Sequence, residues 1–215
     1  MKASLRRTGC WTTAFASGAA DQRLRVVAQF GADQPVHAAI QGINATGMEQ
    51  IAERAPVSKR TLYVHFPTKI DLVIAHLQDL ASSGHTLESV LTREDIPARD
   101  RILGMFVQPA ADAAPVRGCP FIDAAAEFPD PHSTVHAYAR EQKLMMVRLV
   151  TALVTDLGCH EPAALAEQLV TLADGAASRA MVLGDPDYGR HARAAAEILL
   201  DNALPRRGFG PSDCR

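Results

Sequence analysis

Three hydroxyl residues, each placed where a helix can begin, divide one stretch of this chain into short helical segments. Thr46, Ser58 and Thr68 lie within residues 42–72, which read GINATGMEQIAERAPVSKRTLYVHFPTKIDL. Side-chain oxygens of Ser and Thr accept hydrogen bonds from the free backbone N–H groups of a first helical turn, so these residues favour helix starts. Glu49 stands three residues after Thr46, at the spacing of a capping box. The pattern predicts two short helices joined by a tight turn and followed by a third helix.

Apolar residues at helical spacing indicate which sides of these segments face inward. The second helix is expected over residues 59–66, where Leu62 and Phe66 stand four residues apart on one face. The third is expected over residues 69–82. On the first and third helices, the residues expected to be buried are Met48, Ile51, Ala52, Ala55, Leu72, Val73, Leu77 and Leu80. The three helices should therefore share a small apolar core.

Helical periodicity also runs through the rest of the chain, and no stretch shows the alternation that is typical of strands. Pro and Gly residues stand between the periodic segments, as expected at helix ends. The further helices are expected over residues 99–114, 121–128, 133–157, 161–184 and 188–204. We therefore predict an all-α fold.

Charge is distributed unevenly along the chain, although the formal net charge is only -2. Residues 1–80 hold 9 Lys and Arg against 6 Asp and Glu, a net of +3, whereas residues 81–215 hold 13 against 18, a net of -5. A basic N-terminal part and an acidic C-terminal part fit a chain in which only the N-terminal part approaches phosphate groups.

Membrane and secretory segments are not expected. The chain has no apolar run of about 18 residues, and its first twenty residues are too polar for a secretory signal. The 4 cysteines stand at positions 10, 119, 159 and 214, without a C-x-x-C pair or the spacing of a zinc finger. Scattered thiols are typical of a reducing compartment. We therefore predict a cytoplasmic protein without membrane contact.

Sequence motifs of common enzymes do not occur in the chain, which lacks G-x-S-x-G, H-E-x-x-H, P-loop and G-x-G-x-x-G patterns. His132 and His136 stand four residues apart near Asp130 and Glu127, which leaves a metal site open as an alternative. No third ligand stands at helical spacing, so surface histidines are the simpler interpretation. We predict that the protein is not an enzyme and holds no metal or cofactor.

The second short helix carries side chains that suit nucleic acid. Arg60 in its first turn can pair with guanine, and the methyl group of Thr61 can touch a thymine methyl group. Tyr63 and His65 can donate hydrogen bonds to phosphates, and helix starts also favour phosphate. The predicted DNA contacts are Thr46, Lys59, Arg60, Thr61, Tyr63, His65 and Lys69. A basic first turn also occurs on solvated helix faces, so the pattern alone equally fits a generic helical hairpin.

The segment from Ala45 to Leu72 resembles closely the DNA-binding domain of the tetracycline-repressor (TetR) family of transcriptional regulators. The strongest matches are Ile51-Ala52, Val57-Ser58, Thr61-Leu62-Tyr63, His65-Phe66, Lys69 and Leu72. The resemblance implies an N-terminal helix-turn-helix domain and a C-terminal helical domain that binds a small ligand and dimerises through its last two helices. It places the family's DNA contacts at the seven residues named above. The domains expected are an irregular segment over 1–34, the DNA-binding domain over 35–80, the regulatory domain over 81–204 and a tail over 205–215.

Two departures from the family pattern bear on DNA binding. Pro56 stands where the family usually has Gly in the turn, and proline fixes φ near -65°. Residues 1–41, which include Gly31 and Pro35, lack the regular apolar face of the family's first helix. One alternative is therefore a small-molecule-binding helical dimer whose DNA binding is impaired because its first helix is atypical.

Residues 117–131, RGCPFIDAAAEFPDP, resemble a C-terminal domain found in one branch of the family. Side chains that could line a ligand pocket between helices are Phe106, Cys119, Phe121, Phe128, His136 and Met145. Ordinary core packing is the competing interpretation of these residues. Cys119 could be a thiol sensor, or a buried and inert cysteine.

Small residues are frequent in the last two expected helices, among them Gly175, Ala176, Ala194 and Ala195. Small side chains let helices pack closely, so a two-fold four-helix interface between two copies is expected, with packing inside one chain as the alternative. The leading functional prediction is a ligand-responsive transcriptional regulator, in the first place a repressor. Its expected partners are a palindromic double-stranded DNA operator, a small-molecule effector and a second copy of the chain.

Overall fold

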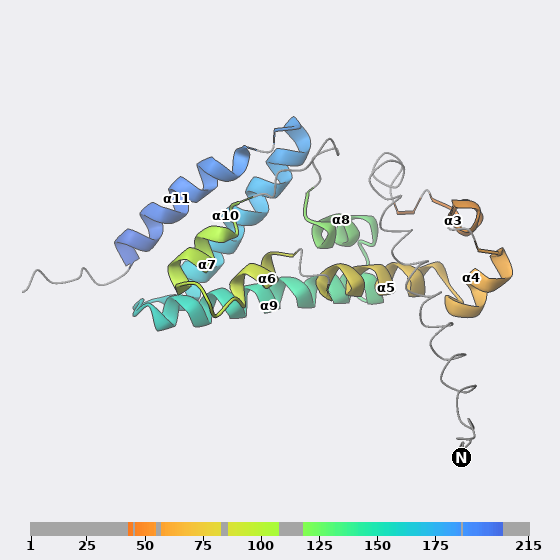
Figure 1. Cartoon of the computed structure of the whole chain (residues 1–215), viewed down its shortest axis with the longest axis horizontal. Helices are drawn as coiled ribbons and strands as arrows, with labels where there is room; N and C mark the ends of the chain where they lie inside the picture. The colour runs from red at the N-terminus through yellow and green to blue at the C-terminus, as the bar shows by residue number, and fades with distance from the viewer. Residues whose placement is uncertain are drawn as a thin grey trace, which may run out of the picture. The chain divides into compact units, whose positions relative to one another are not determined.

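A computed structural model describes residues 43–44, 46–54, 57–82, 86–107, 118–185 and 187–203 of the chain. All regular secondary structure in these ranges is helical, which confirms the predicted all-α fold (Figure 1). The chain divides into two compact units, Met1–Asp79 and Leu80–Arg215. The predictions about residues 1–41, Ala55 and Pro56 lie outside the described residues.

Three helices form the described part of the first unit: α3 (Met48–Arg54), α4 (Lys59–His65) and α5 (Lys69–Ser82), whose last turn passes into the second unit. Ser58 caps α4, because its Oγ accepts a hydrogen bond of 3.0 Å from the backbone N–H of Thr61. Thr68 and Asp71 cap α5 reciprocally. The Thr68 N–H donates to the Asp71 carboxylate at 2.8 Å, and the Asp71 N–H donates to the Thr68 hydroxyl at 3.2 Å. Both predicted helix starts are confirmed.

The predicted capping box of Thr46 and Glu49 is wrong by one residue. The first helix begins at Met48, and the backbone N–H of Gly47 donates to the side-chain oxygen of Gln50 at 2.9 Å. Gln50 stands three residues after Gly47, so the same spacing rule operates one position later. Thr46 precedes the cap and is buried.

The core of the first unit consists of the apolar faces expected from the sequence. Leu62, Phe66, Leu72 and Val73 are fully buried, and α3 packs against α4. Met48, Ile51, Ala52 and Leu77 are buried as well, whereas Leu80 is only half-buried. Burying an apolar side chain of this size stabilises a fold by about 1.5–3 kcal/mol. This core therefore holds the two short helices, which would not be stable alone.

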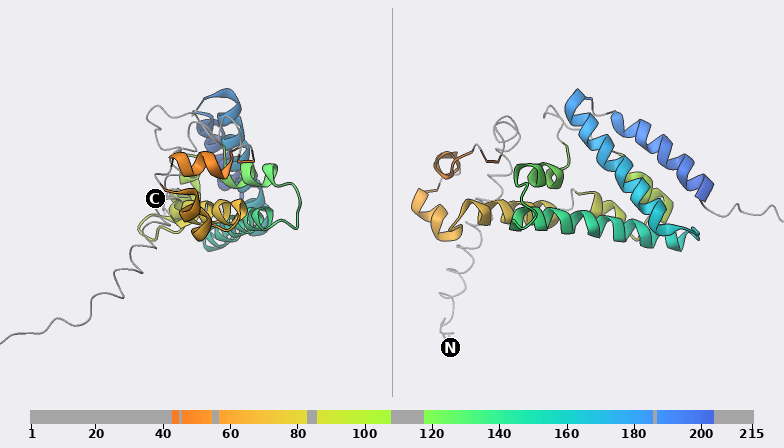
Figure 2. Two further views of the ribbon diagram at one scale, coloured as in Figure 1. Left: turned by 90° about the vertical axis from the view of Figure 1, so that its right-hand side faces the viewer. Right: turned by 180° about the vertical axis from the view of Figure 1, so that it is seen from behind.

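Six helices form the described part of the second unit: α6 (Leu87–Leu91), α7 (Ala98–Gly104), α8 (Pro120–Glu127), α9 (Thr134–Asp156), α10 (Pro162–Leu183) and α11 (Tyr188–Ala203). The long α10 packs along both α9 and α11, and α8 packs against the first half of α9 (Figure 2). The core between them contains Ile102, Leu103, Val150, Val154, Leu169 and Leu200. The four predicted helices from residue 121 onward are confirmed to within one residue at each end.

Side-chain and glycine caps explain why the long helices end where they do. The Oγ of Ser133 accepts a hydrogen bond of 3.1 Å from the N–H of His136 at the start of α9. Gly184 ends α10 with φ 63°, a left-handed conformation that favours glycine. Glycine is required at position 189 in α11 for a different reason. A Cβ atom at Gly189 would lie 2.2 Å from the carbonyl oxygen of Phe106. The start of α11 thus lies directly against the backbone that follows α7.

The helix predicted over residues 99–114 is wrong in its extent. It begins at Ala98 but ends at Gly104, where the N–H groups of Met105 and Phe106 bond to carbonyls three residues back. These tight bonds close the last turn, and glycine has low helix propensity. The short helix α6 was not expected, because five residues are too few to show a period. Residues 108–114 lie outside the described part of the chain.

Candidate functional site

The two faces of α4 differ sharply in exposure. Leu62 is fully buried on one face, as is Phe66, which follows the helix. Lys59, Arg60 and Tyr63 are exposed on the other face. The second short helix is therefore anchored by its apolar side and presents basic and aromatic groups outward, as its sequence predicted.

The first turn of α4 is held by its cap. The hydroxyl groups of Ser58 and Thr61 lie 2.7 Å apart, in addition to the bond between the Thr61 N–H and Ser58. The hydroxyl of Thr61 is therefore fixed by the cap before any ligand binds. Arg60 forms no hydrogen bond or ion pair with any described residue, so its guanidinium is available to a partner.

Lys59 forms an ion pair with Glu49 that joins α4 to α3. The hydrogen bond from Lys59, reinforced by its positive charge, holds the pKa of the Glu49 carboxyl below its ordinary value. The same hydrogen bond and the negative charge of Glu49 raise the pKa of Lys59. Both groups are solvent-exposed, so the pair contributes little to stability. The pair has a larger effect on the binding of a polyanion, because Glu49 locally neutralises the charge of Lys59.

Lys69 at the start of α5 lies close to the segment that precedes α3. Its Nζ donates a hydrogen bond of 2.9 Å to the carbonyl oxygen of Asn44. Six of the predicted DNA contacts thus lie on α4 and at the start of α5, exposed or half-buried. Thr46 differs because it is only 5% exposed, so it presents little surface to a duplex. Whether any of the seven touches DNA stays a prediction.

A cavity of about 280 Å³ lies within the second unit. Its wall includes the end of α5 and residues from α6, α8, α9 and α10. Of the predicted pocket residues, Phe106, Cys119 and Phe121 line it. Phe128, His136 and Met145 do not line it, and Nδ1 of His136 instead lies 2.9 Å from the carbonyl oxygen of Phe128. The neighbouring residue Met146, and not Met145, faces the cavity from α9.

Lys143 and Asp174 form an ion pair in the cavity wall, between α9 and α10. Burial, the largest single influence, would lower the pKa of Lys143, but Cys119 and Asp174 together outweigh it and raise that pKa. The ammonium group therefore stays charged. Sequence reasoning missed this pair because its members stand 31 residues apart on different helices, and no local motif joins them.

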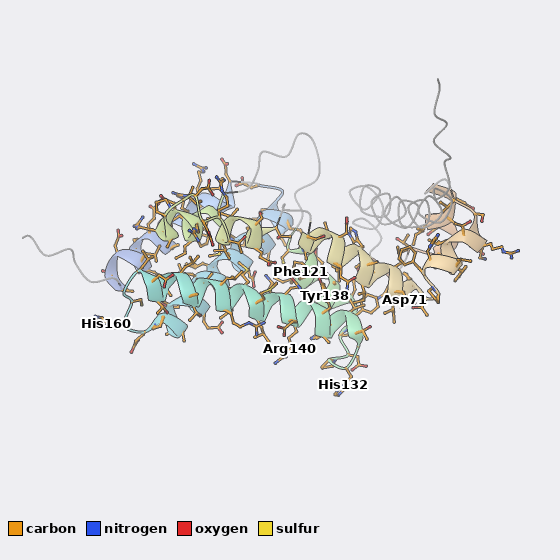
Figure 3. All side chains as sticks on the ribbon, turned by 60° about the horizontal axis from the view of Figure 1, so that its bottom comes forward. Asp71, Phe121, His132, Tyr138, Arg140 and His160 are labelled. Carbon is orange, nitrogen blue, oxygen red and sulfur yellow. The ribbon has the colours of Figure 1, made fainter. Side chains whose placement is uncertain are left out.

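The cavity wall also contains an acidic residue, a residue with a hydroxyl group and aromatic rings. Glu88 and Thr86 line it from the start of α6, and Phe121 lines it from α8. The ring of Phe121 on α8 lies 6.4 Å from the ring of Tyr138 on α9, centroid to centroid (Figure 3). Burial, with a smaller contribution from the charge of Glu88, raises the pKa of Tyr138.

An apolar groove on the surface of the second unit runs between α10 and α11. Leu172, Ile198 and Leu199 line it, with Ile198 62% exposed. Large apolar side chains are rarely left in contiguous exposed groups unless they bind another surface.

Metal and membrane alternatives find no support in the described ranges. No three His, Cys, Asp or Glu side chains gather there closely enough to hold a metal ion, and His132 and His136 form no such group. No described helix is long and apolar enough to cross a bilayer.

Comparison with known proteins gives matches in both units. Residues 38–76 match the family model described as bacterial regulatory proteins, tetR family, and residues 98–196 match the model described as tetracyclin repressor-like, C-terminal domain. The HTH-type transcriptional regulator YjdC of Escherichia coli (strain K12) is 27% identical over 172 residues, which span 79% of this chain and 90% of that protein. The HTH-type transcriptional activator FasR of Mycolicibacterium smegmatis is 53% identical, but over only 38 residues, which are 18% of this chain and 17% of FasR.

Solved structures show the same fold. SCO4454, a TetR-family transcriptional regulator from Streptomyces coelicolor, superposes with a TM-score of 0.68 at 27% sequence identity, over 86% of this chain and 96% of that one. The match extends across both units, so the likeness is not restricted to the short helices.

Proposed function

Because this chain belongs to the tetracycline-repressor family of DNA-binding transcriptional regulators, we propose that it is a ligand-responsive repressor that binds a palindromic operator as a homodimer. The observation that carries the proposal is the exposed face of α4. Lys59, Arg60 and Tyr63 point away from a fully buried apolar side, as a helix in the major groove requires.

The proposed DNA contacts divide by role. Arg60, which has no partner among the described residues, reads a base, and the methyl group of Thr61 adds an apolar base contact. Tyr63, His65 and Lys69 hold the phosphates and set the register. Lys59 must exchange Glu49 for a phosphate when DNA binds. Thr46 is the weakest member of the set because it is buried.

The groove between α10 and α11 supports the homodimer. Two copies that meet through Leu172, Ile198 and Leu199 would bury these exposed apolar groups in a four-helix arrangement about a two-fold axis. Such a dimer would present its two α4 helices to half-sites about 34 Å apart, one turn of DNA. A palindromic operator follows from that symmetry.

The cavity in the second unit supports the response to a ligand. Its volume of about 280 Å³ suits a small molecule, near the lower end of ligand pockets. A ligand that binds better to a conformer with wrongly spaced α4 helices would release DNA. Repression is a simpler mode of regulation than activation, because occupancy of the operator suffices and no contact with another protein is needed. Such a regulator acts where the chromosome lies, so we expect it in the cytoplasm.

The experiment that tests the proposal measures fluorescence anisotropy of labelled duplexes from the region upstream of the protein's own gene. Sequence-specific retention, at least about 1000-fold tighter than a shuffled duplex, is expected. Equal affinity for the two duplexes at every salt concentration would contradict the regulator and would favour the alternative of a ligand-binding dimer with impaired DNA binding.

A further inference from the structure

The charges of the described residues that line the cavity do not balance. Among these residues Lys143, Asp174 and Glu88 are charged, and their formal charges sum to one negative unit at neutral pH. Lys143 and Asp174 are paired with each other. Because a partly buried charge is costly to leave without a partner, this pair is best kept intact when a ligand binds. The unbalanced group is therefore Glu88.

Glu88 is half-buried, and its carboxylate forms no ion pair or hydrogen bond within the described ranges. Its charge acts on Tyr138 of α9, whose ring is tilted against the ring of Phe121, and Phe121 lines the cavity. The faces of aromatic rings are also negative, so Phe106 and Phe121 in the lining favour a cation as well.

The other described residues that line the cavity are mostly apolar, Met105, Phe106, Phe121 and Met146 among them, and Gln142 adds a polar amide. Building on the effector role assigned above, we propose that the cavity takes a small organic monocation with an apolar body. The cationic group lies against Glu88, and the body lies against the aromatic and methionine side chains. An organic anion of the same shape would be repelled by Glu88, and a neutral isostere would leave its charge uncompensated.

Three isosteric probes test the proposal on the full chain without DNA: naphthalene-2-carboxamidine, naphthalene-2-carboxamide and naphthalene-2-carboxylate. Their ring is identical, and their head groups carry one positive charge, none and one negative charge at pH 7.5. Isothermal titration should give the amidine an affinity at least about tenfold higher than the amide, and the carboxylate should bind more weakly than the amide. Equal affinities for amidine and amide, or no binding of any probe, would overturn the proposal.

Variants locate the cation. Glu88→Gln should reduce the preference for amidine over amide to within about threefold, while the affinity for the amide changes less than about twofold. Glu88→Asp, which keeps the charge, should retain most of the preference. Glu94→Gln, a change at an exposed glutamate outside the cavity, is the matched control and should leave all three affinities unaltered. If a folded Glu88→Gln variant kept the full preference for amidine over amide, the assignment of the cation to Glu88 would be wrong. Operator binding is measured separately, so failure of the regulator and failure of the cation site give different results.

Discussion

The two units of this protein build their polar sites in opposite ways. In the first unit, the side-chain bonds that cap α4, the proposed DNA-reading helix, and α5 join residues three apart: Ser58 with Thr61, and Thr68 with Asp71. In the second unit, the polar groups of the cavity come from separate helices, and Lys143 and Asp174 stand 31 residues apart. A site built from residues that are close in sequence can be recognised as a motif. A site built from residues on different helices can be recognised only once the packing of the helices is known.

The largest expected effect tests the apolar support of the first unit. Phe66→Ala removes a fully buried ring beneath α4 and should cost about 3–5 kcal/mol of unfolding free energy. DNA binding should be lost, while binding of small molecules to the second unit should persist if the units fold separately. Urea unfolding followed by circular dichroism, beside titration of the amidine probe, measures both. If the variant lost probe binding together with DNA binding, the two units would not fold independently of each other.

The dimer surface should give the next largest effect. Ile198→Glu places charge on a side chain that is 62% exposed in the single chain but buried in the proposed dimer. We expect monomers in analytical ultracentrifugation and about a 100-fold loss of operator affinity, because two half-sites no longer bind together. Glu167→Gln in the same groove removes charge and serves as the control. A variant that remains dimeric would place the interface elsewhere.

Arg60→Ala tests direct base contact. The variant should lose about 1–3 kcal/mol of binding to the operator and little binding to random DNA. Lys69→Ala should instead weaken binding to both duplexes and reduce the slope of the salt dependence by about one. Competition anisotropy at several salt concentrations separates the two outcomes. An identical loss on both duplexes for Arg60→Ala would remove its assigned role.

The same cap chemistry occurs in both units and allows a matched test. Ser58 caps a helix of 7 residues, and Ser133 caps one of 23 residues with nearly the same geometry. Replacing either by Ala should cost about 1 kcal/mol of stability. Only Ser58→Ala should also weaken operator binding, because it also releases the Thr61 side chain. Similar DNA affinities for the two variants would show that the cap does not organise the reading face.

The smallest effect concerns Glu49. Its carboxylate is ionised at neutral pH, as for any glutamate with an ordinary or lowered pKa, so it pairs with Lys59 and opposes the approach of phosphates. Glu49→Gln should therefore tighten binding to any duplex by about two- to threefold at low salt and make the salt dependence steeper. Glu53→Gln, also exposed on α3, should change affinity less, since no described side chain forms an ion pair with it. Weaker binding after Glu49→Gln would mean that the ion pair positions Lys59 productively.

The sequence was sufficient for the fold class and for most helix boundaries, since caps such as Ser58, Ser133 and Gly184 are local signals. It failed over residues 99–114, where periodicity continued past the true end of α7. Only half of the residues predicted to line a pocket line the cavity. Apolar periodicity shows that a side chain faces inward, but it does not show whether a cavity lies there. Lys143 and Glu88 carry no signal of their own, since isolated charges on amphipathic helices are usually solvated.

At Gly189, the cavity proposed to bind a ligand meets α11, the helix that carries part of the surface proposed for dimerisation. Phe106 lines the cavity, and its carbonyl oxygen leaves no room for even one carbon atom on the first turn of α11. Main chain lies on main chain there, so a displacement at Phe106 cannot be absorbed by rotation of a side chain. We therefore expect a displacement of that carbonyl to shift the start of α11, the helix that carries Ile198.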